Sequence, residues 1–125
     1  KKIFKFLKKK KIPVFGMCRG TQLIADFFGS TFKKVDGEIN VRSHLEINKA
    51  SIYAKFLLKF DTVNSYHNFS IDRISKNLLV SATNEKKIIK AIEHKKFKIF
   101  GQMWHAEREN KIEHNDINLI KNFFK

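Results

Sequence analysis

The stretch that most constrains the fold runs from Ile12 to Ser30 and reads IPVFGMCRGTQLIADFFGS. Its first part, IPVFGM, is a short apolar run that predicts a buried strand. The residues from Thr21 to Phe28 predict a helix that Gly29 ends. We expect the apolar stripe of this helix to consist of Leu23, Ile24, Phe27 and Phe28. A strand that leads through a tight turn directly into a helix is typical of α/β folds.

The turn between the predicted strand and helix carries a G-x-C-x-G pattern at Gly16, Cys18 and Gly20. This pattern has the shape of a nucleophile elbow, which holds the nucleophile clear of the sheet in strained backbone geometry. We expect glycine at both flanking positions because a side chain at either one would crowd the turn. A thiol at a helix N-terminus also feels the helix dipole, which predicts a lowered pKa for Cys18. The backbone N–H of Arg19 would supply half of an oxyanion hole.

The alternative is that Cys18 is a buried structural cysteine that packs as a small hydrophobic residue. The two flanking glycines make a nucleophilic Cys18 about as well supported as a structural one. On these residues alone both interpretations stay open. Cys18 is the only cysteine of the 125 residues, which excludes an internal disulfide framework and a cysteine-rich zinc site. We therefore expect no metal, no cofactor and a reducing, cytoplasmic location.

A thiolate hydrolase needs a histidine that moves protons and an acceptor that orients the imidazole ring. His105 directly follows the apolar run FKIFGQMW, and the carboxyl ends of strands are where open α/β sheets carry their sites. Glu107, two residues further on, can reach back to one ring nitrogen and fix the tautomer. The alternatives are a solvated loop histidine and a surface charge. The H-x-E spacing of zinc deaminases does not apply, because the further cysteine ligands are missing.

The rest of the chain predicts more strands and helices but no second domain, so residues 1–125 are expected to form one domain. A surface helix is expected over Lys1–Lys10, and a closing helix is marked by Ile117, Ile120, Phe123 and Phe124. Short strands and loops are expected between Thr31 and Ile47, whereas the region around Tyr53 to Phe60 fits either a helix or a strand. Three further strands are expected in LLVSAT, IIKAIEH and FKIFGQM.

The formal net charge of +14 suggests nucleic acid or an anionic membrane as a partner. However, only four of the 26 basic residues are arginines, and the sequence contains no recognisable nucleic-acid-binding module. No apolar run approaches the length of a membrane span, and the N-terminal KKIFKFLKKKK lacks the apolar core of a signal peptide. We therefore expect neither a nucleic acid nor a membrane as partner.

Three blocks of the sequence occur in the order typical of class I glutamine amidotransferases. They are PVFGMCRGTQLIADFFGS, VNSYHNFSI and IKAIEHKKFKIFGQMWHAERE, which together extend from Ile12 to Glu109. The chain resembles most of all the γ-glutamyl hydrolase branch of that family, although Ala106 replaces the usual proline of W-H-P-E. The resemblance implies a flavodoxin-like, open and mostly parallel sheet. It also implies hydrolysis of a γ-glutamyl amide, a small-molecule substrate.

The resemblance implies a role for each residue that matches a family motif. Cys18 would be the nucleophile, His105 the general base and then acid, and Glu107 the residue that orients His105. The residues expected to bind substrate are Arg19, Gln22, Ser65, Tyr66 and His67. His67 is expected to be a pocket or structural histidine, because the reaction needs only one base.

The family fold opens with strands and a glycine-rich loop that supplies the second oxyanion N–H. The present chain starts at the helix directly before the nucleophile strand, so we expect an N-terminally incomplete domain. Three functions remain open: a γ-glutamyl hydrolase, a glutaminase that passes ammonia to a synthetase partner, and a truncated non-catalytic protein. The enzymatic functions would require either an additional N-terminal segment or a synthetase partner.

Overall fold

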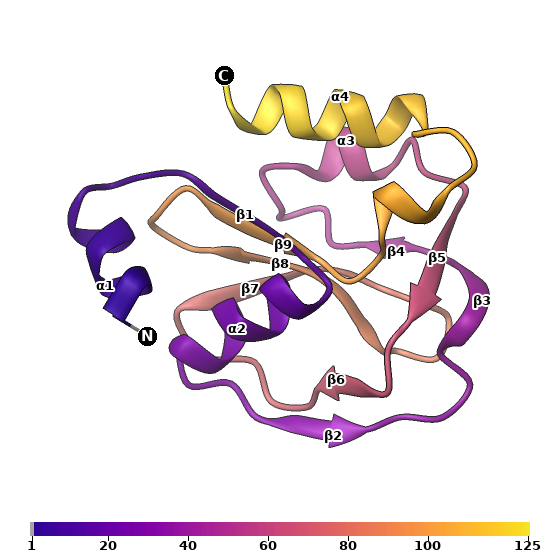
Figure 1. Cartoon of the computed structure of the whole chain (residues 1–125), viewed down its shortest axis with the longest axis horizontal. Coiled ribbons are helices and arrows are strands. Elements are labelled where there is room, and N and C mark those ends of the chain that lie inside the picture. Colours follow the sequence, from indigo (N-terminus) through magenta and orange to yellow (C-terminus); the bar gives the residue numbers. More distant parts are fainter. Residues whose placement is uncertain (1) are drawn as a thin grey trace.

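The computed structural model describes residues 2–125, which form a five-stranded sheet, two small two-stranded ribbons and helices on both faces of the sheet (Figure 1). In spatial order the sheet consists of β1 (Val14–Met17), β9 (Ile99–Gln102), β8 (Ile89–His94), β7 (Leu78–Thr83) and β4 (Glu46–Ile47). The ribbons pair β2 (Phe32–Lys34) with β6 (Phe69–Ile71) and β3 (Ile39–His44) with β5 (Thr62–Tyr66). The helices are α1 (Lys2–Lys9), α2 (Arg19–Phe27), α3 (Ala54–Leu57), α4 (His114–Phe123) and the 3-10 turn η1 (Ala106–Arg108).

The expected α/β class is confirmed, but the sheet of the described residues is mixed rather than mostly parallel. Only β1 and β9 run parallel, whereas β8 is antiparallel to both β9 and β7, and β4 is antiparallel to β7. The reason is the length of the connections. The segments 84–88 and 95–98 are short turns, and such turns return the chain in the opposite direction.

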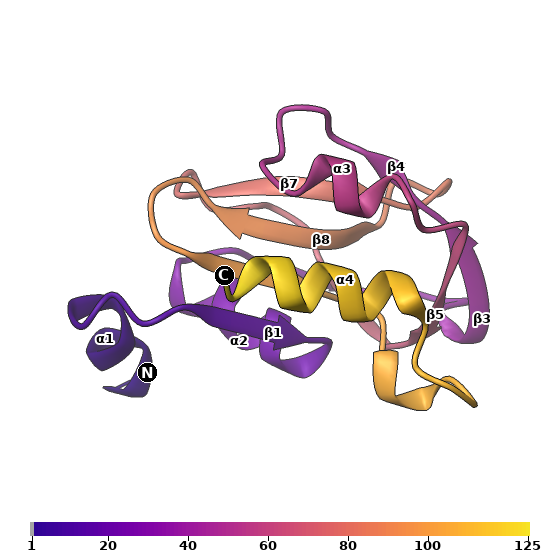
Figure 2. The same cartoon turned by 90° about the horizontal axis from the view of Figure 1, so that it is seen from above.

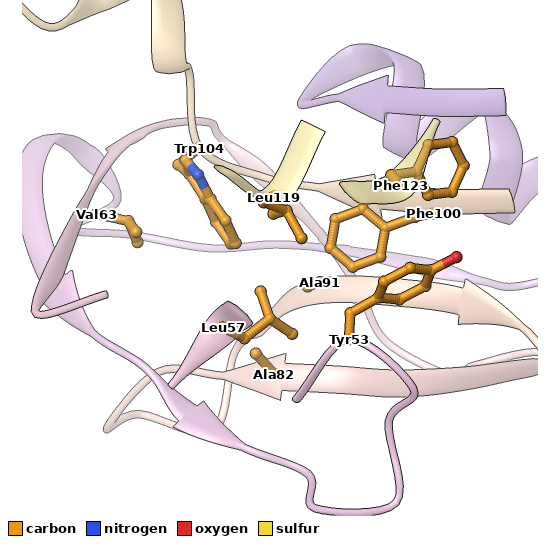
Figure 3. Close-up of a cluster of buried hydrophobic side chains, with 9 residues drawn as sticks. All are labelled: Tyr53, Leu57, Val63, Ala82, Ala91, Phe100, Trp104, Leu119 and Phe123. Carbon is orange, nitrogen blue, oxygen red and sulfur yellow. The ribbon is translucent and has the colours of Figure 1, made fainter. Parts of the chain in front are cut away.

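The helices α3 and α4 cover one face of the sheet, and the largest aromatic cluster lies beneath them (Figures 1 and 3). Figure 3 shows Tyr53, Phe100 and Phe123 gathered there, with ring centroids 5.1 Å apart for the first two. The indole Nε1–H of Trp104 donates to Oδ1 of Asp116 over 2.9 Å, which fixes α4 on the strand that leads to His105. The predicted closing helix is confirmed, and it buries Asp116, Leu119 and Phe123.

Helix α2 covers the opposite face of the sheet, where Ile24 and Ala25 pack against a second cluster that includes Ile92 and Ile99 (Figures 1 and 2). The predicted helix is confirmed, and Gly29 follows it with a φ of +93°, a conformation that favours glycine. The expected apolar stripe is wrong at Leu23, which is 55% exposed. Thr21 lies in the buried face instead.

The remaining elements include two strands that the sequence pattern did not single out, β5 and β6. The ambiguous region from Tyr53 to Phe60 contains the short helix α3, whose Leu57 is buried. The predicted surface helix is confirmed as α1, although Lys1 lies outside the described residues. In α1, Ile3 and Phe6 are exposed rather than packed. Within residues 2–125, no helix combines the length and the apolar character that crossing a membrane requires.

Candidate active site

Cys18 lies in the sharp turn between β1 and α2, with φ of +46° and ψ of −98°. A positive φ is strained for a residue with a side chain, and such strain is typical of functional turns. Two backbone hydrogen bonds hold this geometry: Cys18 N–H donates to Gln102 O over 2.7 Å, and Gln22 N–H donates to Cys18 O over 3.0 Å. The turn is therefore fixed by β9 on one side and by the first turn of α2 on the other.

The glycines near the turn differ in what they allow. A Cβ at Gly16 would lie 2.8 Å from Ile24 Cδ1 and 2.9 Å from the Thr21 nitrogen, so the predicted need for glycine there is confirmed. At Gly20 no atom of another element in the described part of the chain lies within 4 Å of such a Cβ, so the same prediction is wrong. The tight position is instead Gly101, where a Cβ would lie 2.7 Å from Thr21 Cγ2. Helix α2 crosses β1 and β9 closely, which demands small residues on the strands rather than in the helix.

The Cys18 thiol is buried, and burial raises its pKa. The charge of Arg108, the Arg19 N–H and the charge of Lys90 act in the opposite direction, but they do not offset burial. The expected lowering of the thiol pKa is therefore wrong, because loss of water around the sulfur outweighs the helix N-terminus. A thiol of this kind needs a neighbouring base before it can attack a carbonyl.

His105 directly precedes η1 and lies just beyond β9, which is the parallel neighbour of β1, the strand that leads into Cys18. Its Nδ1 lies 2.9 Å from Oε2 of Glu107, so Glu107 does reach back to the ring. Burial raises the pKa of Glu107, but the hydrogen bond with His105, a backbone hydrogen bond and nearby positive charge together outweigh burial and hold the pKa below its usual range. An ionised Glu107 accepts a hydrogen bond from Nδ1–H, which leaves Nε2 of His105 free to exchange protons.

Asn64 on β5 holds the backbone of His105 from both sides, and sequence reasoning did not single it out. Its Oδ1 accepts from His105 N–H over 2.8 Å, and its Nδ2 donates to His105 O over 2.7 Å. Tyr66, two residues along the same strand, lies with its ring centroid 6.0 Å from that of His105. The Arg108 guanidinium stacks 4.5 Å from the Tyr66 ring centroid. The only signal for Asn64 in the sequence was its place within the VNSYHNFSI block.

Ser65 and His67 alternate with these residues and lie in a buried cluster with Glu38 and Lys90. Both side chains are less than 5% exposed. Burial and the Lys90 charge lower the pKa of His67 to about 4, so its ring is neutral near pH 7. This agrees with a structural histidine. Contact of Ser65 and His67 with substrate stays a prediction, and Tyr66 is the half-buried side chain of the three.

Arg19 and Gln22 line an open groove of about 400 Å³ beside α2. The other residues that line it are Leu23, Asp26, Phe32 and Phe69. Gln22 Nε2 donates to Phe69 O over 3.1 Å, which connects α2 to the β2–β6 ribbon. Within residues 2–125, no three His, Cys, Asp or Glu side chains gather in a way that would hold a metal ion.

A protein-family model described as Peptidase C26 matches residues 2–107, a range that contains Cys18, His105 and Glu107. The chain belongs to the Peptidase C26 family. This result confirms the resemblance to class I glutamine amidotransferases and their γ-glutamyl hydrolase branch. It also supports the prediction of an enzyme of the hydrolase or amidotransferase type.

Two relatives of this Peptidase C26 chain carry different names, one a hydrolase and the other a synthase. It is 34% identical over 124 residues to γ-glutamyl-CDP-amidate hydrolase of Campylobacter jejuni subsp. jejuni serotype O:2, covering 99% of this chain and 56% of the relative. It is 28% identical to a glutamine-hydrolyzing GMP synthase of Campylobacter jejuni subsp. doylei, covering 91% of this chain and 22% of that protein. The chain thus spans about half, or less, of the relatives it matches.

Solved structures share the fold of this Peptidase C26 chain at low sequence identity. A putative GMP synthase component of Thermoplasma acidophilum superposes with a TM-score of 0.78 at 20% identity, covering 97% of this chain and 60% of that one. A glutamine amidotransferase of Thermotoga maritima gives a TM-score of 0.72 at 20% identity, covering 97% and 52% of the two chains. Both agree with the expected fold class.

Proposed function

We propose that this chain carries the nucleophile and the base of a cysteine-dependent γ-glutamyl amide hydrolase. One observation carries the proposal. The strained turn at Cys18 and the paired His105 and Glu107 follow adjacent parallel strands, so both lie at the same edge of the sheet. Nucleophile, base and orienting carboxylate are the three parts that thiol-dependent acyl transfer requires.

The proposed reaction begins with proton transfer from the Cys18 thiol to Nε2 of His105. The sulfur then attacks the γ-carbonyl carbon of the glutamyl group, and the Arg19 N–H donates to the oxyanion that forms. Collapse of this intermediate breaks the C–N bond, and His105 gives its proton to the leaving nitrogen. His105 next removes a proton from water, and the resulting hydroxide attacks the thioester carbonyl. The C–S bond then breaks to release glutamate, and His105 returns its proton to the sulfur, which restores the thiol. Throughout the reaction Glu107 accepts the hydrogen bond from Nδ1–H, so that this proton stays on His105, and its charge stabilises the imidazolium.

The raised pKa of the Cys18 thiol fits a mechanism in which His105 is indispensable. A thiol with a strongly lowered pKa would attack as a preformed thiolate with less help from a base. A buried thiol with a raised pKa must instead give its proton to a base when the substrate is bound. We therefore propose that proton transfer to His105 accompanies attack on the carbonyl.

The substrate that we propose is a γ-glutamyl-CDP-amidate, from which the enzyme would release glutamate and cytidine diphosphoramidate. The segments NSYHNFSI and MWHAERE resemble those of γ-glutamyl-CDP-amidate hydrolase, and a hydrolase of that name is 34% identical. This substrate would place the protein in the biosynthesis of capsular phosphoramidate, in the cytoplasm. The single cysteine supports the reducing location.

A second candidate is a glutaminase unit that passes ammonia to a synthetase partner. The similarity to glutamine-hydrolyzing GMP synthases and to the putative GMP synthase component of Thermoplasma acidophilum supports this alternative. The same three residues would act on free glutamine, and the partner would consume the ammonia.

Residues 1–125 are proposed to form one partial domain. The Arg19 N–H is one oxyanion donor, and we propose that the second comes from an additional N-terminal segment or from a partner. Loss of one such donor costs about 2.7–4 kcal/mol of transition-state stabilisation. The DNA directly upstream tests this proposal: an in-frame continuation that encodes a Gly-Gly loop would support it.

The function is tested by measuring glutamate release from γ-glutamyl-CDP-amidate, a γ-glutamyl amine and free glutamine. The protein is assayed as the present chain and together with any in-frame upstream segment, with Cys18→Ala as the control. We expect the CDP-linked substrate to be cleaved best, and no cleavage by the variant. Preference for glutamine only when a synthetase is added would favour the glutaminase. Equal rates for the variant and the parent would refute the cysteine mechanism.

A further inference from the structure

Four polar side chains form a buried cluster behind the candidate active site: Glu38, Ser65, His67 and Lys90. Each is less than 5% exposed, and Lys90 is fully buried. The Lys90 ammonium lies 2.6 Å from Glu38 Oε1, 2.8 Å from Ser65 Oγ and 2.9 Å from His67 Nε2. Ser65 Oγ in turn donates to Glu38 Oε1 over 2.9 Å.

The hydrogen bonds of this cluster are complete. An ammonium group has three N–H donors, and each of them meets one acceptor. His67 accepts from Lys90 at Nε2 because its Nδ1–H donates to Phe69 O over 2.9 Å. Burial raises the pKa of Glu38. The hydrogen bond and the charge of Lys90, together with the hydrogen bond from Ser65, outweigh burial and keep the carboxyl ionised. Burial lowers the pKa of Lys90, and Glu38 opposes that change.

A buried ion pair is a poor way to gain stability. Removing two charges from water is expensive, and apolar residues of similar volume are often as stabilising or more so. The energy of the pair therefore does not explain why a lysine occupies the centre of the fold. Its position relative to the candidate site offers another explanation.

Lys90 contacts both of the segments that support His105. Its carbonyl oxygen accepts from Met103 N–H over 2.8 Å, two residues before His105. Its ammonium holds Ser65, whose neighbour Asn64 binds the His105 backbone on both sides. Burial raises the pKa of the Cys18 thiol; the charge of Arg108, the Arg19 N–H and the charge of Lys90 act to lower it, and the charge of Glu107 acts to raise it.

We propose that Lys90 is a positioning residue of the candidate active site, which orders residues 64–67 around His105 and holds a positive charge within electrostatic reach of Cys18. This inference rests on the proposed function, because it assumes that Cys18 and His105 react together. Glu38 is the counter-charge that lets Lys90 stay protonated without contact with water. Lys90 itself touches no substrate.

Alkylation of Cys18 by iodoacetamide measures the charge effect without any substrate. Cys18 is the only cysteine of the chain, so the rate reports on one thiol. The main variant is the double substitution Glu38→Gln with Lys90→Met, which removes both buried charges and leaves neither unpaired. We expect it to fold and to shift the midpoint of alkylation upward, with a severalfold loss of thiolate at a fixed pH. A folded double variant with an unchanged midpoint would overturn the charge effect.

Two further variants keep the test informative. Lys90→Gln retains donors for Glu38 while it removes the charge, and we expect the same upward shift. Lys86→Met is the matched control, because Lys86 also lies near Glu38, 4.0 Å from Oε2, but its side chain is 58% exposed. We expect no shift for this variant. A shift as large as that of Lys90→Gln would mean that net charge alone is responsible, which would overturn the role of Lys90.

Ser65→Ala tests the ordering effect, because it removes one of the two hydrogen bonds from Lys90 to residues 64–67 but keeps both charges. We expect kcat for glutamate release to fall severalfold, with the alkylation midpoint nearly unchanged. An unchanged kcat would overturn the ordering role. If the unaltered protein releases no glutamate even together with the upstream segment or the partner, the proposed function fails, and the alkylation profiles still decide whether Lys90 acts on Cys18.

Discussion

Strand β8 carries two buried charged side chains, Lys90 and Glu93, and the fold accommodates them in different ways. Lys90 lies on the face of the sheet that α2 covers and forms an ion pair with Glu38. Glu93 lies on the other face, where neutral donors bind it: Ser51 Oγ, Ser81 Oγ at 2.7 Å and the Ile52 N–H at 3.2 Å. Lys90 and Glu93 are thus only three positions apart on one strand, but Lys90 has a charged partner. Among residues 2–125, the hydrogen-bond donors to Glu93 are all neutral.

The difference follows from what each group is near. Glu93 binds the loop that leads into α3. Burial and, as the smaller cause, the charge of Glu93 raise the pKa of Tyr53 to about 12. Its hydrogen bonds within the described chain go to that loop and to β7, away from Cys18 and His105. The Lys90 cluster contacts both supports of His105 and acts on the thiol. We therefore expect changes around Glu93 to alter stability alone, and changes around Lys90 to alter stability and reactivity together.

The largest expected effect lies at the residues that react. His105→Asn should reduce glutamate release about 10⁴-fold, and Cys18→Ala should be about as damaging, because nucleophile and base act as a unit. Glu107→Gln should be milder, since it alters only the orientation and charge of the ring. Steady-state rates on a γ-glutamyl amide measure all three. If His67→Asn were fatal and His105→Asn harmless, the assignment of the base would be wrong.

The next largest effect concerns the stability of the charged pair. Lys90→Met leaves Glu38 buried without its counter-charge and should lower the free energy of unfolding by about 3–5 kcal/mol. Urea unfolding monitored by circular dichroism measures this change. Adding Glu38→Gln should recover most of the loss, because no charge then remains unpaired. Equal stability of the single and the double variant would mean that the pair is not coupled.

Sequence reasoning found the parts of the site that depend on local spacing. The G-x-C-x-G turn and the H-x-E pair each lie within a few residues, and the strands before them are apolar enough to be recognised. Because β1 and β9 are parallel neighbours, these two short patterns meet at the same edge. The strand–turn–helix order was therefore sufficient to predict at which edge of the sheet the candidate residues lie.

The parts that were missed depend on contacts between distant residues. Asn64 and His105 are 41 residues apart, and Glu38 and Lys90 are 52 apart. Nothing in the local pattern of a lysine in IIKAIEH indicates that its side chain is buried. The direction of the Cys18 pKa was predicted wrongly for the same reason. The helix dipole can be inferred from the turn, whereas burial of the sulfur depends on the packed structure.

A pH-dependent loss of stability should follow from the same cluster. The pKa of His67 is about 4 in the folded protein and about 6.5 when unfolded, so the unfolded state binds more protons between these values. Stability should therefore fall by about 3 kcal/mol as the pH drops from 7 to 4. The lowered pKa of Glu38 adds to this loss below its unfolded value. Urea unfolding at both pH values checks the prediction, and His67→Gln should flatten the profile.

The smallest expected effect lies at the neutral cluster. Ser81→Ala removes one of the hydroxyl donors to Glu93 and leaves a buried carboxylate with fewer partners. The free energy of unfolding should fall by about 1–3 kcal/mol, because the lost hydrogen bond is not replaced by water. The alkylation midpoint of Cys18 should stay unchanged, since no charge near the thiol is altered. Ser65→Ala is the matched change on the other face, and it should lower kcat as well as stability. If Ser81→Ala lowered kcat per folded molecule as much as Ser65→Ala does, the two faces of β8 would be coupled. The reactive edge of the sheet would then depend on the whole strand rather than on the Lys90 cluster.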